Sequence, residues 1–365
     1  MAQQERKRRM ETYDLIPRAG NPRNSEGAFI ENGPNELLFL YSAFSGEKAR
    51  DYTHADIHGI RSTDNGHTWS EPWAVARARD YNAMNIMSVS LMRMQNGDIG
   101  LFYLVRRSWL DMSVVLQRSK DGGRTWSVPI TCSTRKGYYV MNNDRAIRTS
   151  SGRILLPAAE HLNELTADGR LRFVPSRVVF FYSDDDGYAW HESDEHISLD
   201  IPLSQSGLQE PGIVELSRGH LFGWARTDMG RQYAFVSRDN GAHWSEARPS
   251  WFTSPLSPLS MKKLKNGALL AVWNPVPKNN LSQEDTVTDG RYPLVYARST
   301  DEGSTWSQPQ MIEDDPSAGY CYTAIYEHGT ALYLAYCAGG IQDFGSCLNR
   351  LRIRRMPWTD EGLAP

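Results

Sequence analysis

The sequence of 365 residues is poor in cysteine and has no long hydrophobic run. Its four cysteines are too few for a disulfide framework and lack the paired spacing typical of metal ligands, so we expect buried free thiols. No stretch approaches the ~20 apolar residues that a membrane helix requires. The opening MAQQERKRRMETYDL has no apolar segment after its positive charges. These absences predict no membrane partner and a cytoplasmic protein.

An excess of basic residues is also missing. The 40 Lys and Arg residues against 43 Asp and Glu residues give a formal net charge of −3, without a basic stripe that would suit a polyanion. We therefore expect no nucleic-acid partner. Helical periodicity is equally weak, since no long window keeps apolar residues at a spacing of 3.6. The sequence is thus typical of an all-β protein.

What the sequence does contain is one motif in five copies. Ser-x-Asp-x-Gly-x-x-Trp begins at Ser62, Ser119, Ser183, Ser237 and Ser299, with 57, 64, 54 and 62 residues between successive starts. Such a period indicates a repeat fold. We interpret each copy as a closed turn between two strands, in which Ser and Asp bond local backbone and Gly takes a positive φ. Because these side chains bond their own backbone, we predict a structural motif.

Short apolar strands lie between these turns. Hairpin segments begin at Asn35, Asn96, Ser151, Arg218, Asn266 and His328, and another strand candidate precedes each one. Units of four strands repeated about six times predict a six-bladed β-propeller of four-stranded antiparallel blades. We expect a tail over 1–12 and a single domain over 13–365, with one blade completed by both chain ends.

The predicted architecture gathers polar residues at one mouth of the central channel. The innermost strands begin on this face, and the loops from second to third strands lie there too. The strand starts carry Arg23, Asn85, Asp144, Arg145, Glu210, Ser257 and Tyr320, and the loops carry Asp51, His54, Asp56, Arg106, Arg107, Glu160, His161, Arg226 and Arg291. Such a cluster is costly to desolvate unless it binds a ligand or pairs internally, so we treat this mouth as the candidate site.

With these residues the chain resembles the sialidase-like proteins with Asp-box (BNR) repeats, over almost its whole length. That family uses three arginines that hold a substrate carboxylate, a tyrosine nucleophile, a glutamate beside it and an aspartate acid/base. By sequence context, Glu210 matches the glutamate, Arg226 and Arg291 match the second and third arginines, and Tyr320 matches the nucleophile.

The resemblance implies an exo-acting glycoside hydrolase that retains configuration through a tyrosyl intermediate. It further implies a substrate that is an oligosaccharide or glycoconjugate with an acidic sugar, and no metal or organic cofactor. In this scheme Tyr320 attacks the sugar and Glu210 accepts its proton. Planar guanidinium groups suit the carboxylate because they bind it through two parallel hydrogen bonds.

The first blade matches the family less closely. The family's first arginine usually stands in Arg-Ile-Pro, whereas this chain has IPRAGNPRNSEGAFIE. Arg23 lies directly ahead of the predicted strand and is our choice, with Arg18 as the second choice.

The acid/base residue is open among three carboxyl groups. Asp51 matches the family's offset in the loop GEKARDYTHADIHGIRS, and Asp56 and Glu26 are its rivals, since sequence alone gives neither reach nor pKa. His54, His161 and Glu160 are candidates for contact with sugar hydroxyls. A metal is not predicted there, because no His-x-x-x-His type spacing is present.

The largest departure from the family is VMNNDRAIRT, which replaces small Gly and Pro residues. We predict Asp144 and Arg145 at the mouth, either as substrate contacts or as a mutual ion pair that supports the rim. Direct contact would favour a sugar other than a common sialic acid. Two further functions therefore stay open: a hydrolase or lyase that acts on another ulosonate or a uronate, and a non-catalytic carbohydrate-binding propeller.

Overall fold

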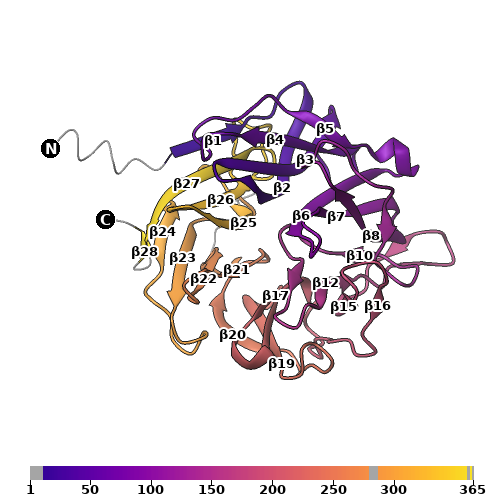
Figure 1. Cartoon of the computed structure of the whole chain (residues 1–365). Helices are drawn as coiled ribbons and strands as arrows, with labels where there is room; N and C mark the ends of the chain where they lie inside the picture. Colours follow the sequence, from indigo (N-terminus) through magenta and orange to yellow (C-terminus); the bar gives the residue numbers. More distant parts are fainter. Residues whose placement is uncertain (1–10, 279–286, 360–361, 364–365) are drawn as a thin grey trace.

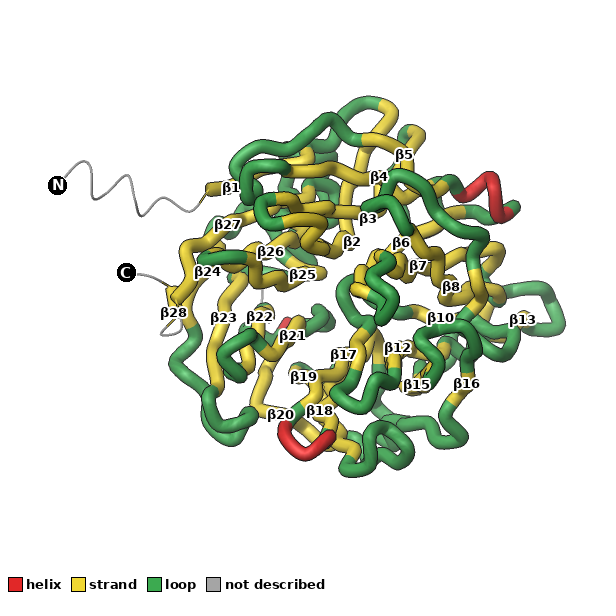
Figure 2. Tube along the Cα trace, in the orientation of Figure 1, coloured by secondary structure: helices red, strands yellow, loops and turns green. Residues whose placement is uncertain are grey.

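The computed structural model describes residues 11–278, 287–359 and 362–363. Its strands form six blades around a central axis (Figure 1). The predicted all-β, six-bladed propeller of four-stranded antiparallel blades is confirmed. The described residues also contain two 3₁₀ turns (Figure 2). These are η1 (Ala78–Tyr81), between β5 and β6, and η2 (Ser217–Gly219), between β17 and β18.

The first three blades follow one another along the chain. Blade one contains β2 (Gly20–Gly33), β3 (Glu36–Gly46), β4 (Ala55–Ser62) and β5 (Trp73–Ala76). Blade two contains β6 (Asn85–Arg93), β7 (Ile99–Ser108), β8 (Asp111–Ser119) and β9 (Ile130–Thr131). In blade three, β10 (Tyr139–Val140) and β11 (Ile147–Arg148) both pair with β12 (Ile154–Glu160), which is followed by β15 (Arg177–Ser183) and β16 (His191–Glu192). A hairpin of β13 (Glu164–Leu165) and β14 (Leu171–Arg172) lies between β12 and β15 in the chain.

The other three blades complete the ring. Blade four contains β17 (Gln209–Glu215), β18 (Leu221–Arg226), β19 (Arg231–Ser237) and β20 (Arg248–Thr253). Blade five contains β21 (Ser260–Lys263), β22 (Leu269–Trp273), β23 (Leu294–Ser299) and β24 (Gln310–Glu313). Blade six contains β25 (Cys321–His328), β26 (Ala331–Cys337), β27 (Leu351–Thr359) and β1 (Glu11–Leu15), and β28 (Gly362–Leu363) also pairs with β27.

Both chain ends contribute to blade six, as predicted. β1 pairs antiparallel with β27, from Glu11 opposite Arg355 to Leu15 opposite Leu351 (Figure 1). This pairing closes the ring and removes an open sheet edge. β1 begins at Glu11, so residues 11 and 12 belong to the sheet and not to the predicted tail; residues 1–10 lie outside the described residues.

The repeated motifs form closed turns. At the first copy, Ser62 Oγ donates to Asp64 Oδ1 at 2.8 Å and accepts the Gly66 N–H at 2.7 Å, and Asp64 Oδ1 accepts the Thr68 N–H at 2.9 Å. The same set of bonds recurs in the other four copies. The structural interpretation of the motif is thereby confirmed.

The hydrophobic core consists of layers between neighbouring blades. One layer packs Leu38 and Ile57 of blade one against Leu101 and Val115 of blade two, and the other layers follow the same plan. Cys132, Cys321, Cys337 and Cys347 are free and buried, as expected. No helix in the described residues has the length and apolar character needed to cross a bilayer.

Candidate functional site

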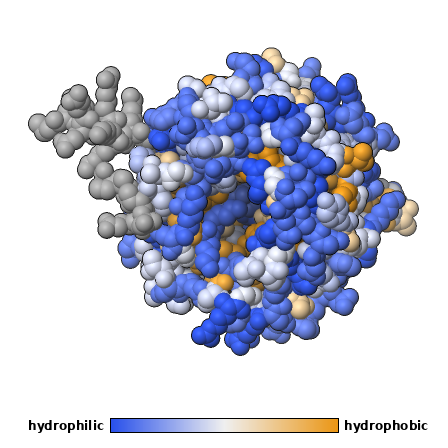
Figure 3. All heavy atoms as spheres, viewed as in Figure 1, coloured by the Kyte–Doolittle hydropathy of each residue, from blue (hydrophilic) through white to orange (hydrophobic). Residues whose placement is uncertain are grey.

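A cavity of about 450 Å³ opens where the innermost strands begin. Its lining comes from strand starts and from second-to-third loops, including Glu26, Asp51, Ser88, Arg106, Asn142, His161, Glu210, Arg226 and Tyr322. These are the two sets of segments that the propeller topology places at one mouth. Figure 3 shows the molecule as spheres in the same orientation as Figure 1. The centre of the ring is hollowed and surrounded largely by hydrophilic residues.

Left-handed backbone positions turn four side chains of the innermost strands into this cavity. Glu26, Ser88, Glu210 and Tyr322 have φ values of 56°, 63°, 47° and 59°. Each lies within a shift of strand register, as in a β-bulge. A bulge re-aims a side chain, and the left-handed region costs a non-glycine residue about 1–2 kcal/mol. Four blades thus accept backbone strain at the positions that build the site.

Tyr322, Glu210 and Arg226 form one hydrogen-bonded group. The Tyr322 hydroxyl donates to Glu210 Oε1 at 3.1 Å, and Arg226 Nη1 lies 3.0 Å from Glu210 Oε2. The same Nη1 also donates to the Tyr322 oxygen at 3.5 Å. Gln209 accepts from the other edge of the Arg226 guanidinium and orients it. A phenol therefore lies between a carboxylate that can accept its proton and a permanent positive charge.

The electrostatics of this group favour a neutral phenol. Burial raises the pKa of Tyr322 well above its ordinary value, and the Glu210 charge raises it further, while Arg226 and Arg291 act in the opposite direction. Burial also opposes the charge on Arg226, but Glu210 and Tyr322 together outweigh it and the pKa of Arg226 is raised. Removal of the phenolic proton therefore needs both the carboxylate and the arginines.

The expectation that Tyr320 stands beside Glu210 is wrong. Tyr320 is buried in the hydrophobic layer between blades five and six, with its ring centroid 6.3 Å from that of Tyr336. Two tyrosines spaced by two residues would face the same side of a regular strand. The left-handed backbone at Tyr322 breaks this alternation and sends its ring into the cavity. The sequence Tyr-Cys-Tyr contains both tyrosines, and local pattern alone does not decide which of them reaches the cavity.

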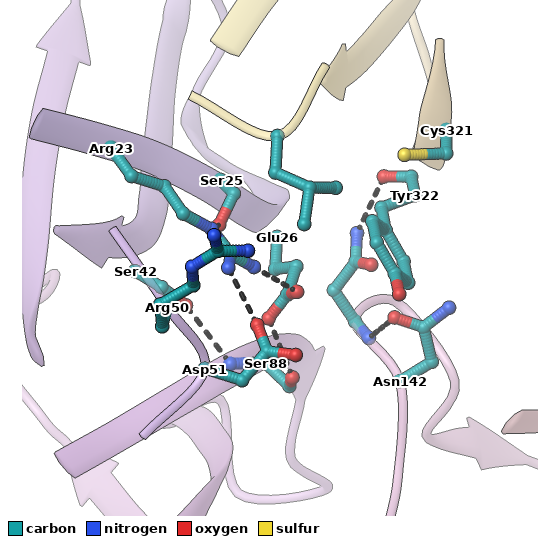
Figure 4. A network of polar contacts seen from close by, with 12 residues as sticks. Arg23, Ser25, Glu26, Ser42, Arg50, Asp51, Ser88, Asn142, Cys321 and Tyr322 are labelled. Carbon is teal, nitrogen blue, oxygen red and sulfur yellow. Dashed lines mark hydrogen bonds and ion pairs between the residues drawn. The ribbon is translucent and has the colours of Figure 1, made fainter. Parts of the chain in front are cut away.

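Arg23 lies across from Tyr322, between two carboxylates (Figure 4). Arg23 Nη1 is 2.6 Å from Asp51 Oδ1, and Nη2 is 2.9 Å from Glu26 Oε1. Ser88 Oγ donates to the other Glu26 oxygen at 2.8 Å. Arg23 is fully buried, so both ion pairs compensate a charge that has left water.

The two carboxyl groups on Arg23 have opposite pKa shifts. Burial raises the pKa of Glu26, and the adjacent Arg23 offsets only part of this effect. Desolvation acts to raise the pKa of Asp51 as well, but Arg23, Arg106 and Arg291 outweigh it and the pKa is lowered. The Asp51 side chain is 58% exposed, so it is open to an incoming molecule.

The structure corrects the predictions for Asp56 and His54. Asp56 Oδ1 accepts the Ala78 N–H at 2.8 Å, and His54 Nδ1 lies 2.9 Å from Ser45 Oγ. Neither belongs to the described residues that line the cavity. Both side chains form hydrogen bonds with nearby segments of blade one and the chain that follows it. The position of the acidic residues in the sequence did not indicate these bonds. Asp51 and Glu26 are the predicted acid/base candidates that do reach the cavity.

Arg291 lies behind Tyr322. Its Cζ atom is 5.3 Å from the Tyr322 ring centroid, and Nη1 donates to Cys321 Sγ at 3.2 Å. Asp289 is 3.7 Å from Nη2 and completes its surroundings. Because Arg291 also lowers the pKa of Asp51, the charges of the three predicted arginines act on one set of acidic and phenolic groups.

Asp144 and Arg145 do not contact the cavity, so both predictions for them are corrected. Asp144 accepts from Lys262 Nζ at 2.8 Å and from the Ile325 N–H at 3.0 Å. Arg145 is buried and donates to the Leu259 carbonyl at 2.7 Å; burial lowers its pKa to about 10. The ion pair of Asp144 is therefore with Lys262 of blade five, and Asn142 is the residue of this segment that lines the cavity.

Arg106 and His161, two of the residues predicted at the mouth, both line the cavity. Arg106 donates to the Asp51 carbonyl, and its Cζ atom lies 5.5 Å from the ring centroids of both Trp109 and Tyr138. Burial, with Arg226 and Arg106, lowers the pKa of His161 to about 4. Arg106 lies near the end of β7 and His161 directly follows β12, so each stands where a second strand leads into the loop toward the third. Glu160 does not line the cavity and pairs with Arg177 at 2.7 Å.

Aromatic side chains edge the opening of the cavity. Tyr52, Trp109 and Phe173 are 48%, 37% and 68% exposed and all line it. The ring centroids of Tyr52 and Trp109 are 5.8 Å apart. Within the described ranges, no group of three or more His, Cys, Asp or Glu side chains is arranged to hold a metal ion.

These features define a class: a six-bladed propeller whose mouth combines arginines, carboxylates and a tyrosine. The model of the BNR repeat-like domain family matches residues 36–334. The chain therefore belongs to this family and is a sialidase-like BNR-repeat protein.

Comparison with individual proteins agrees with this assignment. The chain is 24% identical over 342 residues to a sialidase from Bacteroides fragilis, which covers 81% of this chain and 56% of the relative. It is 26% identical over 239 residues to a sialidase from Paraclostridium sordellii, over 58% of this chain and 55% of the relative. The chain thus spans about half the length of these curated relatives. A Hadza microbial sialidase superposes with a TM-score of 0.70 at 16% identity, over 93% of this chain and 66% of that one, and shares the fold.

Proposed function

We propose that this protein is an exo-acting glycoside hydrolase of sialidase type. It releases a terminal sialic-acid-like sugar from an oligosaccharide or glycoconjugate, with retention of configuration. The observation that carries the proposal is the hydrogen bond from the Tyr322 hydroxyl to Glu210, with Arg226 against both groups. The relatives named sialidase support the same class.

The first chemical step joins Tyr322 to the sugar. The phenolic oxygen bonds to the anomeric carbon as the bond from that carbon to the leaving oxygen breaks. Glu210 accepts the phenolic proton, and Asp51 donates a proton to the leaving oxygen. A phenol suits this step because the substrate carboxylate on the anomeric carbon repels an anionic nucleophile.

Water completes the reaction. Asp51, now a carboxylate, takes a proton from water as the water oxygen bonds to the anomeric carbon. The bond between this carbon and Tyr322 breaks, and Glu210 returns its proton to the phenolic oxygen. Two displacements on the same carbon retain its configuration.

Arg23, Arg226 and Arg291 hold the substrate carboxylate in this proposal. Arg23 is paired with Asp51, and this pairing lowers the pKa of Asp51. A substrate carboxylate competes for the same guanidinium, so the pKa of Asp51 rises when substrate binds. Asp51 can then hold the proton that a general acid must donate.

The remaining groups of the cavity fit a sugar substrate. Tyr52, Trp109 and Phe173 offer exposed aromatic faces on which a leaving-group sugar can stack. Because Asp144 and Arg145 bond to blades five and six, they no longer favour a different acidic sugar over a sialic acid.

Fluorophore release from aryl glycosides of sialic, deaminated sialic, other ulosonic and uronic acids tests the proposal. We expect turnover of a sialic-type substrate, loss of turnover in Tyr322→Phe, and activity close to wild type in the matched variant Tyr320→Phe. Turnover of other acids alone would contradict the substrate class. Undiminished turnover in Tyr322→Phe would contradict the mechanism.

A further inference from the structure

Residues 142–145, here called the hub segment, join blade three to every other blade at the centre of the ring. Asn143 bonds to Gly27 of blade one and to Tyr322 of blade six. The N–H groups of Asp144 and Arg145 donate to Val89 O and Ser90 Oγ of blade two. The Arg145 side chain reaches Leu259 ahead of β21 in blade five, and its Cζ atom is 5.7 Å from the Trp224 ring of blade four.

Within the hub segment, the Asn143 side chain bonds to the backbone of two innermost strands that carry residues of the candidate site. Its Nδ2 donates to the Gly27 carbonyl at 2.9 Å and to the Tyr322 carbonyl at 3.1 Å. Its own N–H donates to Asn142 Oδ1 at 2.8 Å. Asn143 is 1% exposed, so water does not replace these bonds. Both protons of the amide are therefore used on the backbone of two other blades.

Each of these carbonyls belongs to a bulge that aims a side chain into the cavity. Gly27 follows Glu26, whose φ is 56°, and Tyr322 itself has a φ of 59°. A left-handed residue with a side chain persists only where its surroundings determine it. The single amide of Asn143 holds both bulges, one behind the ion pair of Glu26 with Arg23 and one behind the hydrogen bond of Tyr322 with Glu210.

We propose that Asn143 is a positioning residue, which sets the Tyr322 phenol against Glu210 through the Tyr322 backbone carbonyl. It contacts the main chain of Tyr322 and takes no part in proton transfer. The kinetic consequence rests on the function proposed above, whereas the geometric consequence does not.

Asn143→Asp tests the proposal because aspartate has the same shape and a carboxylate cannot donate to a carbonyl. A misplacement of about 1 Å at a reacting group can cost about 10²-fold in rate. We expect kcat on the sialic-type aryl glycoside to fall by this factor, with KM changed little because the arginines remain. The matched control is Arg145→Lys, which weakens the bond between the hub segment and the Leu259 carbonyl of blade five. It is expected to lower the melting temperature and leave kcat close to wild type.

A crystal structure of Asn143→Asp separates the geometric consequence from the kinetic one. We expect the Tyr322 hydroxyl to move out of hydrogen-bond distance of Glu210. If the wild-type protein hydrolyses no acidic glycoside, the proposed function fails, and this structure still decides the geometric claim. Should Asn143→Asp not fold, Asn143→Ser keeps a shorter single donor and is expected to lose kcat to a smaller extent.

Three outcomes would overturn the inference. One is an intact bond between Tyr322 and Glu210 in a folded Asn143→Asp or Asn143→Ser structure. Another is wild-type kcat in either variant. The third is an equal fall of kcat in Arg145→Lys, because the effect would then follow from any loosening of the hub segment.

Discussion

The Tyr322 hydroxyl of blade six donates a hydrogen bond to Glu210 Oε1 of blade four at 3.1 Å. The two residues are far apart in the chain, and each occupies a left-handed backbone position in its innermost strand. The bond exists because bulges in the innermost strands of two different blades aim their side chains at one point.

Replacement of Glu210 by glutamine should reduce kcat about 10²- to 10⁴-fold, the range typical of general acid–base groups. Glutamine keeps the shape and can still accept a hydrogen bond from Tyr322, but it does not take up the phenolic proton. Steady-state kinetics on the sialic-type aryl glycoside would measure the loss. Glu215→Gln is the control, since this residue lies on the same strand and its carboxylate binds Ser150. Equal activity of Glu210→Gln and Glu215→Gln would exclude Glu210 from proton transfer.

Arg226→Lys should raise KM by about 10-fold or more. Lysine keeps the charge but loses the planar pair of donors, and two charge-assisted hydrogen bonds are each worth about 1.5–3 kcal/mol. The matched control is Arg107→Lys, an exposed arginine whose Nη1 donates to Ser113. A KM unchanged in Arg226→Lys would contradict a role in binding the carboxylate.

Stability should fall as pH decreases from about 6.5 to about 4, in part because of His161. Its pKa in the folded protein is about 4, below the ordinary value, chiefly because burial opposes its charge. The unfolded chain therefore binds more protons over this interval, which favours unfolding at low pH. Thermal unfolding of wild type and His161→Gln across this range would measure the effect. The variant is expected to show a shallower decline, and identical slopes would refute the assignment.

Ser119→Ala should destabilise the fold and leave catalysis unchanged. Ser119 Oγ accepts the Gly123 N–H at 2.8 Å and donates to Asp121 Oδ1 at 2.8 Å, and it is almost completely buried. Loss of a buried hydrogen-bond partner costs about 1–3 kcal/mol. The midpoint of urea unfolding should fall, whereas kcat and KM should match wild type. A selective loss of activity would show that the repeated turns have a role beyond structure.

The sequence by itself determined the repeat, the strand order within a blade and the number of blades. These features depend on local chemistry: Ser62, Asp64 and Gly66 close a turn with their own backbone, and apolar alternation defines each strand. It also located Glu210, Arg226 and Asp51 at the cavity, because topology places strand starts and second-to-third loops on one face.

Only the tertiary structure decided which side chains meet. Tyr322 and not Tyr320 faces Glu210, because a bulge overrides the alternation of a regular strand. Asp144 pairs with Lys262, 118 residues away, because the hub segment lies where the blades converge. Bulges and cross-channel hydrogen bonds depend on the blades being packed around a common axis, and no local pattern in the chain encodes that packing.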